Sequence, residues 1–274
     1  MRRTRLGGPL MPSAPSFQAV PGTKAGFAGT VPGAGPGSGA TSTVETASGQ
    51  QVRLVQYPHM ALTQPSYEVA ESEWRSPTFA SKISKLVQSL TALRCFSICA
   101  PKTKWPVQII VVKIDSVSGE YDCFVNPTAP GYDDQNRVAP MYGMWENDGS
   151  MGNVTAWVIR PQQVVVTARD EYGVEKTQVL RGLKARLFMH EFDFLRGTTF
   201  VEHALSSDFV MSSTALYQKS VWPIGFPSME AHMTDQQMFF DYTTNQVVLP
   251  EGLEWLHGMN AAAAQFHFDG RLGA

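Results

Sequence analysis

Long apolar runs are missing from this sequence of 274 residues, and cysteine is scarce. No stretch of about 18 consecutive apolar residues occurs, so the sequence predicts no membrane-spanning helix. The three cysteines, Cys95, Cys99 and Cys123, are odd in number and have no C-x-x-C spacing. This pattern favours free thiols in a reducing compartment over a disulfide framework.

Charged residues are also few, at 17% of the sequence, with a formal net charge of −2. This balance argues against a surface that is basic throughout and wraps nucleic acid, while a local basic patch stays compatible with it. Hydrophobic residues, in contrast, make up 43% of the chain. They are enough to bury a core in one domain of ordinary size with extensions, or in two small domains.

Acidic residues are absent from the first 44 positions, where the basic residues are Arg2, Arg3, Arg5 and Lys24. Glycine, proline, serine, alanine and threonine supply most of the remainder. Such a composition is typical both of an organelle targeting segment and of a flexible tail. The glycine and proline content opposes a long amphipathic helix. We therefore expect residues 1–51 to be a targeting segment or an extended arm that lies on a partner.

Helix and strand patterns begin near residue 52. Ser76 and Pro77 form a helix start, and the apolar residues that follow recur at helical spacing, which predicts one amphipathic helix packed on a core. Segments rich in β-branched and aromatic residues predict strands, namely 52–58, 107–114, 121–127, 156–159, 164–168, a strand near Val179, and 246–250. We expect 156–159 and 164–168 to pair. Gly182 opens a further helix, and strands followed by a late crossing helix indicate an α+β domain.

His190 and Glu191 lie in this late helix, within the segment H-E-F-D-F. In the H-E-x-x-H motif of metallohydrolases, two histidines at i and i+4 project toward one metal, and the glutamate activates a bound water. Here the i+4 position is Phe194, whose ring has no lone pair to give to a cation. The sequence therefore predicts a helix that keeps its place in the fold after losing this chemistry.

Residues 190–200 read H-E-F-D-F-L-R-G-T-T-F, which resembles the H-E-x-D-H-L-x-G-x-x-F motif of peptide deformylases. Every specified position except the second histidine agrees. Members of that family remove the formyl group from nascent chains with a divalent metal held by one cysteine and two histidines. The resemblance covers roughly residues 52–205. It implies a peptide-deformylase-like fold, with antiparallel or mixed sheets around a central helix.

Two further motifs of the family are degraded in this chain. At the motif G-x-G-x-(A/S)-A-P-Q, Cys95 and Ser97 replace both glycines, and Lys102 replaces the glutamine that would polarise the formyl oxygen. Side chains at the glycine positions are expected to crowd the substrate pocket. At the motif E-G-C-L-S, a count without gaps places residues 146–150, with Asp148 where the family has its cysteine ligand.

The resemblance thus leaves His190, Asp148 and Phe194 as vestiges at the three former ligand positions, and we expect no metal or other cofactor. Glu191 and Lys102 are vestiges of the catalytic groups, so we expect a pseudoenzyme. If the motifs meet, Lys102 is expected to pair with Glu191 or Asp148 in place of the cation, and Phe194 to fill the vacated space. The alternative is a divergent but active metal-dependent deformylase. A binder of N-terminal peptides would need a cleft that bulky side chains at these positions obstruct.

Residues 206–274 depart from the minimal family pattern and are rich in methionine and aromatic residues. These residue types are enriched at protein interfaces, so we expect either packing on the chain's own domain or a docking arm. Deformylases work where nascent chains emerge, in bacteria and in organelles of bacterial origin. The resemblance therefore implies a structural subunit of the mitochondrial ribosome, or of its assembly intermediate, in the mitochondrial matrix. Its partners would be mitochondrial ribosomal proteins, with rRNA contact through Arg2, Arg3 and Arg5.

Overall fold

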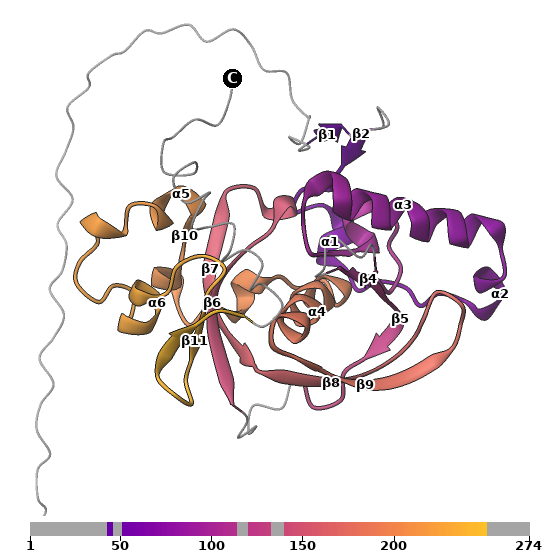
Figure 1. The fold of residues 1–274 in the computed structure, drawn as a ribbon. Coiled ribbons are helices and arrows are strands. Elements are labelled where there is room, and N and C mark those ends of the chain that lie inside the picture. Colours follow the sequence, from indigo (N-terminus) through magenta and orange to yellow (C-terminus); the bar gives the residue numbers. More distant parts are fainter. Residues whose placement is uncertain (1–42, 46–50, 114–119, 133–139, 251–274) are drawn as a thin grey trace, which may run out of the picture. The chain divides into compact units, whose positions relative to one another are not determined.

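The computed structural model describes residues 43–45, 51–113, 120–132 and 140–250, which belong to one unit, Gly39–Ala274 (Figure 1). The α-helices are α1 (Met60–Thr63), α2 (Glu71–Trp74), α3 (Pro77–Leu93), α4 (Gly182–Leu195), α5 (Ser213–Leu216) and α6 (Met229–Met233). The 3₁₀ helices are η1 (Ala100–Thr103), η2 (Gly149–Met151), η3 (Phe200–His203), η4 (Ser207–Phe209) and η5 (Lys219–Val221). Within the described residues, no helix has both the length and the apolar character that crossing a membrane requires.

The strands form two five-stranded sheets and one two-stranded ribbon. The first sheet has the order β3 (Ser97–Cys99), β4 (Ile109–Val112), β5 (Asp122–Thr128), β8 (Gln163–Arg169) and β9 (Glu175–Arg181). The second has the order β10 (Val210–Ser212), β7 (Val154–Pro161), β6 (Met141–Asn147), β11 (Phe239–Asp241) and β12 (Gln246–Val248). The ribbon joins β1 (Thr43–Glu45) to β2 (Gln51–Arg53). All the registered strand pairs are antiparallel, and the helices with them make an α+β fold, as predicted.

Strand β4 is buried on both faces because each face meets a different helix. Ile109 and Val111 lie in one apolar cluster with the buried stripe of α3, whereas Ile110 and Val112 lie in another with α4. Alternation along a strand sends successive side chains to opposite faces, so four consecutive apolar residues serve two cores. The helix α3 itself confirms the sequence prediction, and Ser76 caps it by accepting a hydrogen bond from the amide of Phe79 at 3.1 Å.

Helix α4 lies between the two sheets, where Figure 1 shows it enclosed by strands. Ten of its fourteen residues are buried, and these include Arg186, His190, Glu191 and Asp193. A helix that is buried all round normally carries apolar residues all round. Four buried ionisable side chains on one such helix therefore require partners from the surrounding strands.

The pairing expected between the segments 156–159 and 164–168 is wrong. Both form strands, but β7 pairs with β6 and β10, whereas β8 pairs with β5 and β9 in the other sheet. Gln162 alone separates β7 from β8, and a β-hairpin needs about two loop residues. The amide of Gln162 donates instead to the carbonyl oxygen of Pro140, so the chain passes here from one sheet to the other.

The described part of the C-terminal extension joins the deformylase-like domain. Strand β10 pairs with β7, and β11 pairs with β6. Residues 206–250 therefore follow the alternative in which the extension packs on its own domain. At the other end, residues 43–45 of the expected arm pair with residues 51–53 in the β1–β2 ribbon. Arg2, Arg3 and Arg5 lie outside the described residues.

Gly197, just after α4, gives a direct test of the close approach between this part of the chain and the end of α1. Its φ is +78°, and a Cβ would lie 2.8 Å from the carbonyl carbon of Gln64. Gly173 is a matched control with a φ of +86°, where the nearest atom, on Trp74, is 3.9 Å away. Gly173→Ala should cost about 1 kcal/mol of strain. Gly197→Ala should cost about 1–3 kcal/mol more, because the backbone at the end of α1 must move. Urea unfolding of both variants measures the difference, and equal losses would contradict the close approach.

Candidate functional site

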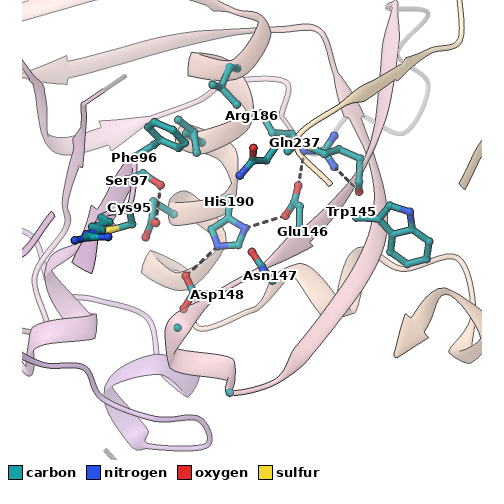
Figure 2. A pocket seen from close by; sticks show the side chains of 17 residues that line it. Cys95, Phe96, Ser97, Trp145, Glu146, Asn147, Asp148, Arg186, His190 and Gln237 are labelled. Atoms are coloured by element: carbon teal, nitrogen blue, oxygen red, sulfur yellow. Dashed lines mark hydrogen bonds and ion pairs between the residues drawn. The ribbon is translucent and has the colours of Figure 1, made fainter. Parts of the chain in front are cut away.

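The three sequence segments that contain Lys102, Asp148 and His190 meet at one place beside α4. Lys102 comes from η1, directly after β3, and Asp148 follows β6, where its carboxylate accepts from the amide of Ser150 and caps η2. His190 and Glu191 are adjacent on α4. Three segments that are distant in sequence thus bring two carboxylates, an ammonium and an imidazole together. Figure 2 shows His190 and Asp148 facing each other at this place.

Lys102 forms ion pairs with both carboxylates, which confirms the contact expected from the sequence. Its Nζ lies 2.5 Å from Oδ2 of Asp148 and 2.7 Å from Oε2 of Glu191, and its side chain is 2% exposed. Burial alone would lower the pKa of Lys102, but attraction to Asp148 and Glu191 outweighs it and raises that pKa above its usual value. Burial would raise the pKa of Asp148, and Lys102 outweighs it and holds that pKa well below its usual range. Both groups are therefore charged at neutral pH.

Phe194 and Ser97 complete the surroundings of this ion-pair group. The Nζ atom of Lys102 lies 4.3 Å from the centroid of the Phe194 ring, a cation–π distance. Phe194 is fully buried. The hydroxyl of Ser97 donates to Oε1 of Glu191 at 2.9 Å. Both oxygens of Glu191 are therefore engaged, one by a cation and the other by a hydroxyl.

His190 has a carboxylate at each ring nitrogen. Its Nδ1 lies 2.8 Å from Oε2 of Glu146, and its Nε2 lies 3.2 Å from Oδ2 of Asp148, as Figure 2 shows. Ionised carboxylates only accept hydrogen bonds, so both ring nitrogens carry protons. Burial alone would lower the pKa of His190, but the hydrogen bonds to Asp148 and Glu146 outweigh it and raise the pKa to about 9. In this arrangement the ring is an imidazolium at neutral pH, and a carboxylate faces each of its nitrogens.

Glu146 is the most heavily paired acid of the site. Arg160 donates to both of its oxygens, from Nε at 2.8 Å and from Nη2 at 3.0 Å, and Arg186 forms an ion pair with it. Arg160 also reaches Oδ2 of Asp193 at 2.8 Å. Burial would raise the pKa of Glu146, yet Arg160 and Arg186 hold it well below its usual range.

The buried charges of the site balance without any further ion. Among the described residues, one connected set contains the acids Glu146, Asp148, Glu191 and Asp193 and the cations Lys102, Arg160, Arg186 and protonated His190. Four negative charges therefore face four positive charges. Apart from Asp148, which is partly exposed, each of these eight groups is buried. Partner charges of this kind offset the large cost of removing ions from water.

A pocket of about 400 Å³ opens onto this set, and the expectation of an obstructed cleft is wrong. Cys95 and Ser97 line it without filling it, and Phe194 is not among its lining residues. Burial raises the pKa of Cys95 to about 12, so this thiol is protonated at neutral pH. The apolar part of the wall comes from β6 and α4, with Phe96 beside them.

Sequence reasoning did not assign Arg160, Arg186 or Tyr132 to the site. The hydroxyl of Tyr132 donates to Oδ1 of Asp193 at 2.9 Å, and Arg160 also donates to Tyr132. The available signal for Arg160 was a single arginine directly after the apolar run 156–159, which implies a buried partner acid. His203 pairs with Asp193 at 3.1 Å. Among the described residues, Asp148, His190 and Glu191 lie close enough together to share one metal ion.

Comparison with known families identifies the scaffold. A family profile described as polypeptide deformylase matches residues 52–209, more than half of the 274-residue chain. This chain belongs to the polypeptide deformylase family. Peptide deformylase from Pelodictyon phaeoclathratiforme is 26% identical over 167 residues, which cover 53% of this chain and 84% of the relative. Peptide deformylase 1B, chloroplastic/mitochondrial, from Arabidopsis thaliana is 33% identical over 138 residues, which cover 48% of each chain.

Solved structures agree with this family at the level of the fold. A mutant of peptide deformylase 1B from Arabidopsis thaliana has a TM-score of 0.51 and 23% identity, and the match covers 60% of this chain and 86% of that one. The peptide deformylase fold expected from the sequence is therefore confirmed. The rest of this chain, outside residues 52–209, carries the N-terminal segment and most of the extension that adds β11 and β12 to the second sheet.

The imidazolium of His190 predicts how the stability of this deformylase relative depends on pH. The pKa is about 9 in the folded chain and about 6.5 in the unfolded one. The contribution of protonated His190 to the free energy of unfolding is therefore complete below about pH 6.5 and is lost as the pH rises through about 9. Between about pH 6.5 and 8 the free energy of unfolding should fall by about 2 kcal/mol, before thiols titrate. Urea titrations at several pH values measure this fall, and His190→Gln should abolish it. A wild-type curve that is flat in this window would contradict the assignment.

Proposed function

We propose that this chain is a catalytically inactive deformylase relative that serves as a structural subunit of the mitochondrial ribosome or of its assembly intermediate. One observation supports the loss of catalysis. Hydrolysis would need a free general base and free metal ligands, and here the residues at those positions are already paired with other side chains. Glu191 is paired with Lys102 at 2.7 Å, and both nitrogens of His190 face carboxylates. Neither a free base nor a free ligand nitrogen is left at this site.

The divalent metal of the family does not fit these residues. A catalytic site of this kind needs about three protein ligands with lone pairs and an open position for water. Here Asp148 takes the place of the thiolate and Phe194 the place of an imidazole, and both nitrogens of the remaining His190 already face carboxylates. The ammonium of Lys102 already lies against both carboxylates. We therefore derive no hydrolytic step through a metal.

Without such a metal, water is a poor nucleophile at this site. Free water has a pKa of about 15.7, whereas a catalytic zinc lowers the pKa of its bound water to about 7. Glu191 would have to remove a proton from unactivated water while itself neutralised by Lys102. The alternative function, a divergent but active deformylase, has two observations in its favour. A pocket of about 400 Å³ leads to this point, and Asp148, His190 and Glu191 lie close enough together to share one metal ion.

Hydrolysis of a formyl-methionyl peptide separates these two functions. We expect the purified chain to release formate at a rate at least about 10³-fold below that of an authentic peptide deformylase, with or without added zinc, iron or cobalt. The coupled formate assay measures this rate under identical conditions for both proteins. Turnover within about tenfold of the authentic enzyme would establish the alternative, and Glu191→Gln would then have to abolish it.

Three observations support an organellar translation particle as the site of action. The Arabidopsis thaliana relative with 33% identity carries the name chloroplastic/mitochondrial. The first 44 residues contain no acidic side chain and three early arginines, Arg2, Arg3 and Arg5, which suit a targeting segment or contact with rRNA. The segment 217–233 exposes large apolar side chains, Tyr217, Val221, Ile224, Met229 and Met233. Exposed apolar groups gathered in one segment are typical of protein interfaces, here with mitochondrial ribosomal proteins.

Gradient sedimentation of tagged protein from mitochondria tests this partner assignment. The chain should sediment with ribosomal particles or their precursors, and Ile224→Asp should release it, because Ile224 is 98% exposed and a carboxylate there opposes burial in an interface. Tyr172→Ser is the matched control, because Tyr172 is 83% exposed at the β8–β9 turn, away from the segment 217–233 in sequence. Sedimentation of the wild-type chain only at the top of the gradient would contradict the proposal.

A further inference from the structure

We propose that the ammonium group of Lys102 is a tethered cation that holds the position of a metal ion, and that Asp148, His190 and Glu191 form a metal site that opens only when both the charge and the volume of the Lys102 side chain are removed. The inference rests on distances, burial and charge in the described residues. It is independent of which particle or partner the chain joins. The disagreement between these residues and the metal of the family is its starting point.

The position of the ammonium is the first argument. One potential ligand atom from each of Asp148, His190 and Glu191 lies within 4.8 Å of the others. The Nζ atom of Lys102 lies between the two carboxylates of this group, at 2.5 Å and 2.7 Å. An ammonium at this point satisfies the same two anions that a metal ion would contact. A second cation in direct contact with these oxygens would face its repulsion at short range.

The partners of Lys102 also match an ammonium better than a metal. An ammonium has three N–H donors, and here it has three partners, namely the two carboxylates and the face of the Phe194 ring at 4.3 Å. A ring face attracts an ammonium but gives no lone pair to a metal. Phe194 stands four residues after His190, where the H-E-x-x-H motif has its second histidine. The lysine and the phenylalanine are therefore complementary replacements.

The charge balance explains why the site is closed to a second cation. The acids Glu146, Asp148, Glu191 and Asp193 are already paired with the ammonium of Lys102 and the guanidinium groups of Arg160 and Arg186. A divalent ion added to this set would leave an excess of positive charge in a buried region. Replacement of Lys102 by a small neutral side chain instead leaves an excess of negative charge beside the pocket and opens space for an ion. The pocket reaches Asp148, His190 and Glu191, so an ion from solvent has a route to them.

Three variants of Lys102 in the full chain test the proposal with added Co²⁺ as the probe. Lys102→Ala removes the charge and frees space, Lys102→Met removes the charge and keeps the side-chain volume, and Lys102→Ala with Asp148→Asn also removes a ligand. In metal-free buffer, Lys102→Ala should melt about 10 °C below wild type, because one partner of a buried ion-pair group is lost. Saturating Co²⁺ should restore about 5 °C of this and produce visible absorption of bound cobalt.

The other proteins define what would overturn the proposal. Wild type and Lys102→Met should show no cobalt absorption and no stabilisation, and the double variant should lose the response to cobalt. If Lys102→Ala does not fold, the metal content of wild-type protein purified with excess zinc and cobalt still decides the point, with less than about 0.1 ion per chain expected. Near-stoichiometric metal in the wild type, or a folded Lys102→Ala without any response to cobalt, would refute the tethered cation.

Discussion

The structure depends on one electrostatic constraint, namely that each carboxylate taken out of water beside α4 must be paired with a cation. An isolated buried charge costs far more than a small domain's whole stability, whereas a fully paired set is affordable. Glu146 illustrates the constraint. Arg160 contacts both of its oxygens, Arg186 contacts Oε1 and His190 contacts Oε2. The second proton of His190 follows from the same requirement, since a neutral ring would turn a nitrogen lone pair toward one of the two carboxylates.

Helix α4 meets this constraint through its periodicity. Arg186, His190 and Asp193 recur at i, i+4 and i+7, so they share one face of the helix. Arg186 donates to the carbonyl oxygen of Val158 at 2.6 Å, which shows that this polar face meets the second sheet. Phe188, on another side of the helix, belongs to the apolar cluster of the first sheet. Helix α4 therefore presents a charged face to the second sheet and an apolar face to the first sheet.

The sequence predicted the parts of this arrangement that depend on local pattern. Local pattern predicted the Ser76 start and the apolar stripe of α3, the runs of β4 and β8, and the helix that bears His190. The motif count also placed Asp148 correctly beside Lys102. The sheet change at Gln162 and the role of Arg160 were missed, because they depend on contacts between residues that are far apart in the chain. The open pocket was missed for the same reason: the sequence names the side chains of the wall but not their directions.

The buried charged groups around α4 depend on one another, so the contribution of each to the free energy of unfolding depends on whether its partners are present. A buried ion pair adds little net stability over a well-packed apolar substitute, but removal of one partner alone is costly. The effects of neighbouring charges such as Lys102 and Asp148 are therefore not additive. A lysine introduced beside intact metal ligands would meet a cation, and an aspartate introduced without the lysine would lack one. The ammonium of Lys102, the carboxylates of Asp148 and Glu191 and the ring of Phe194 therefore form one interdependent group, because the ammonium contacts all three side chains.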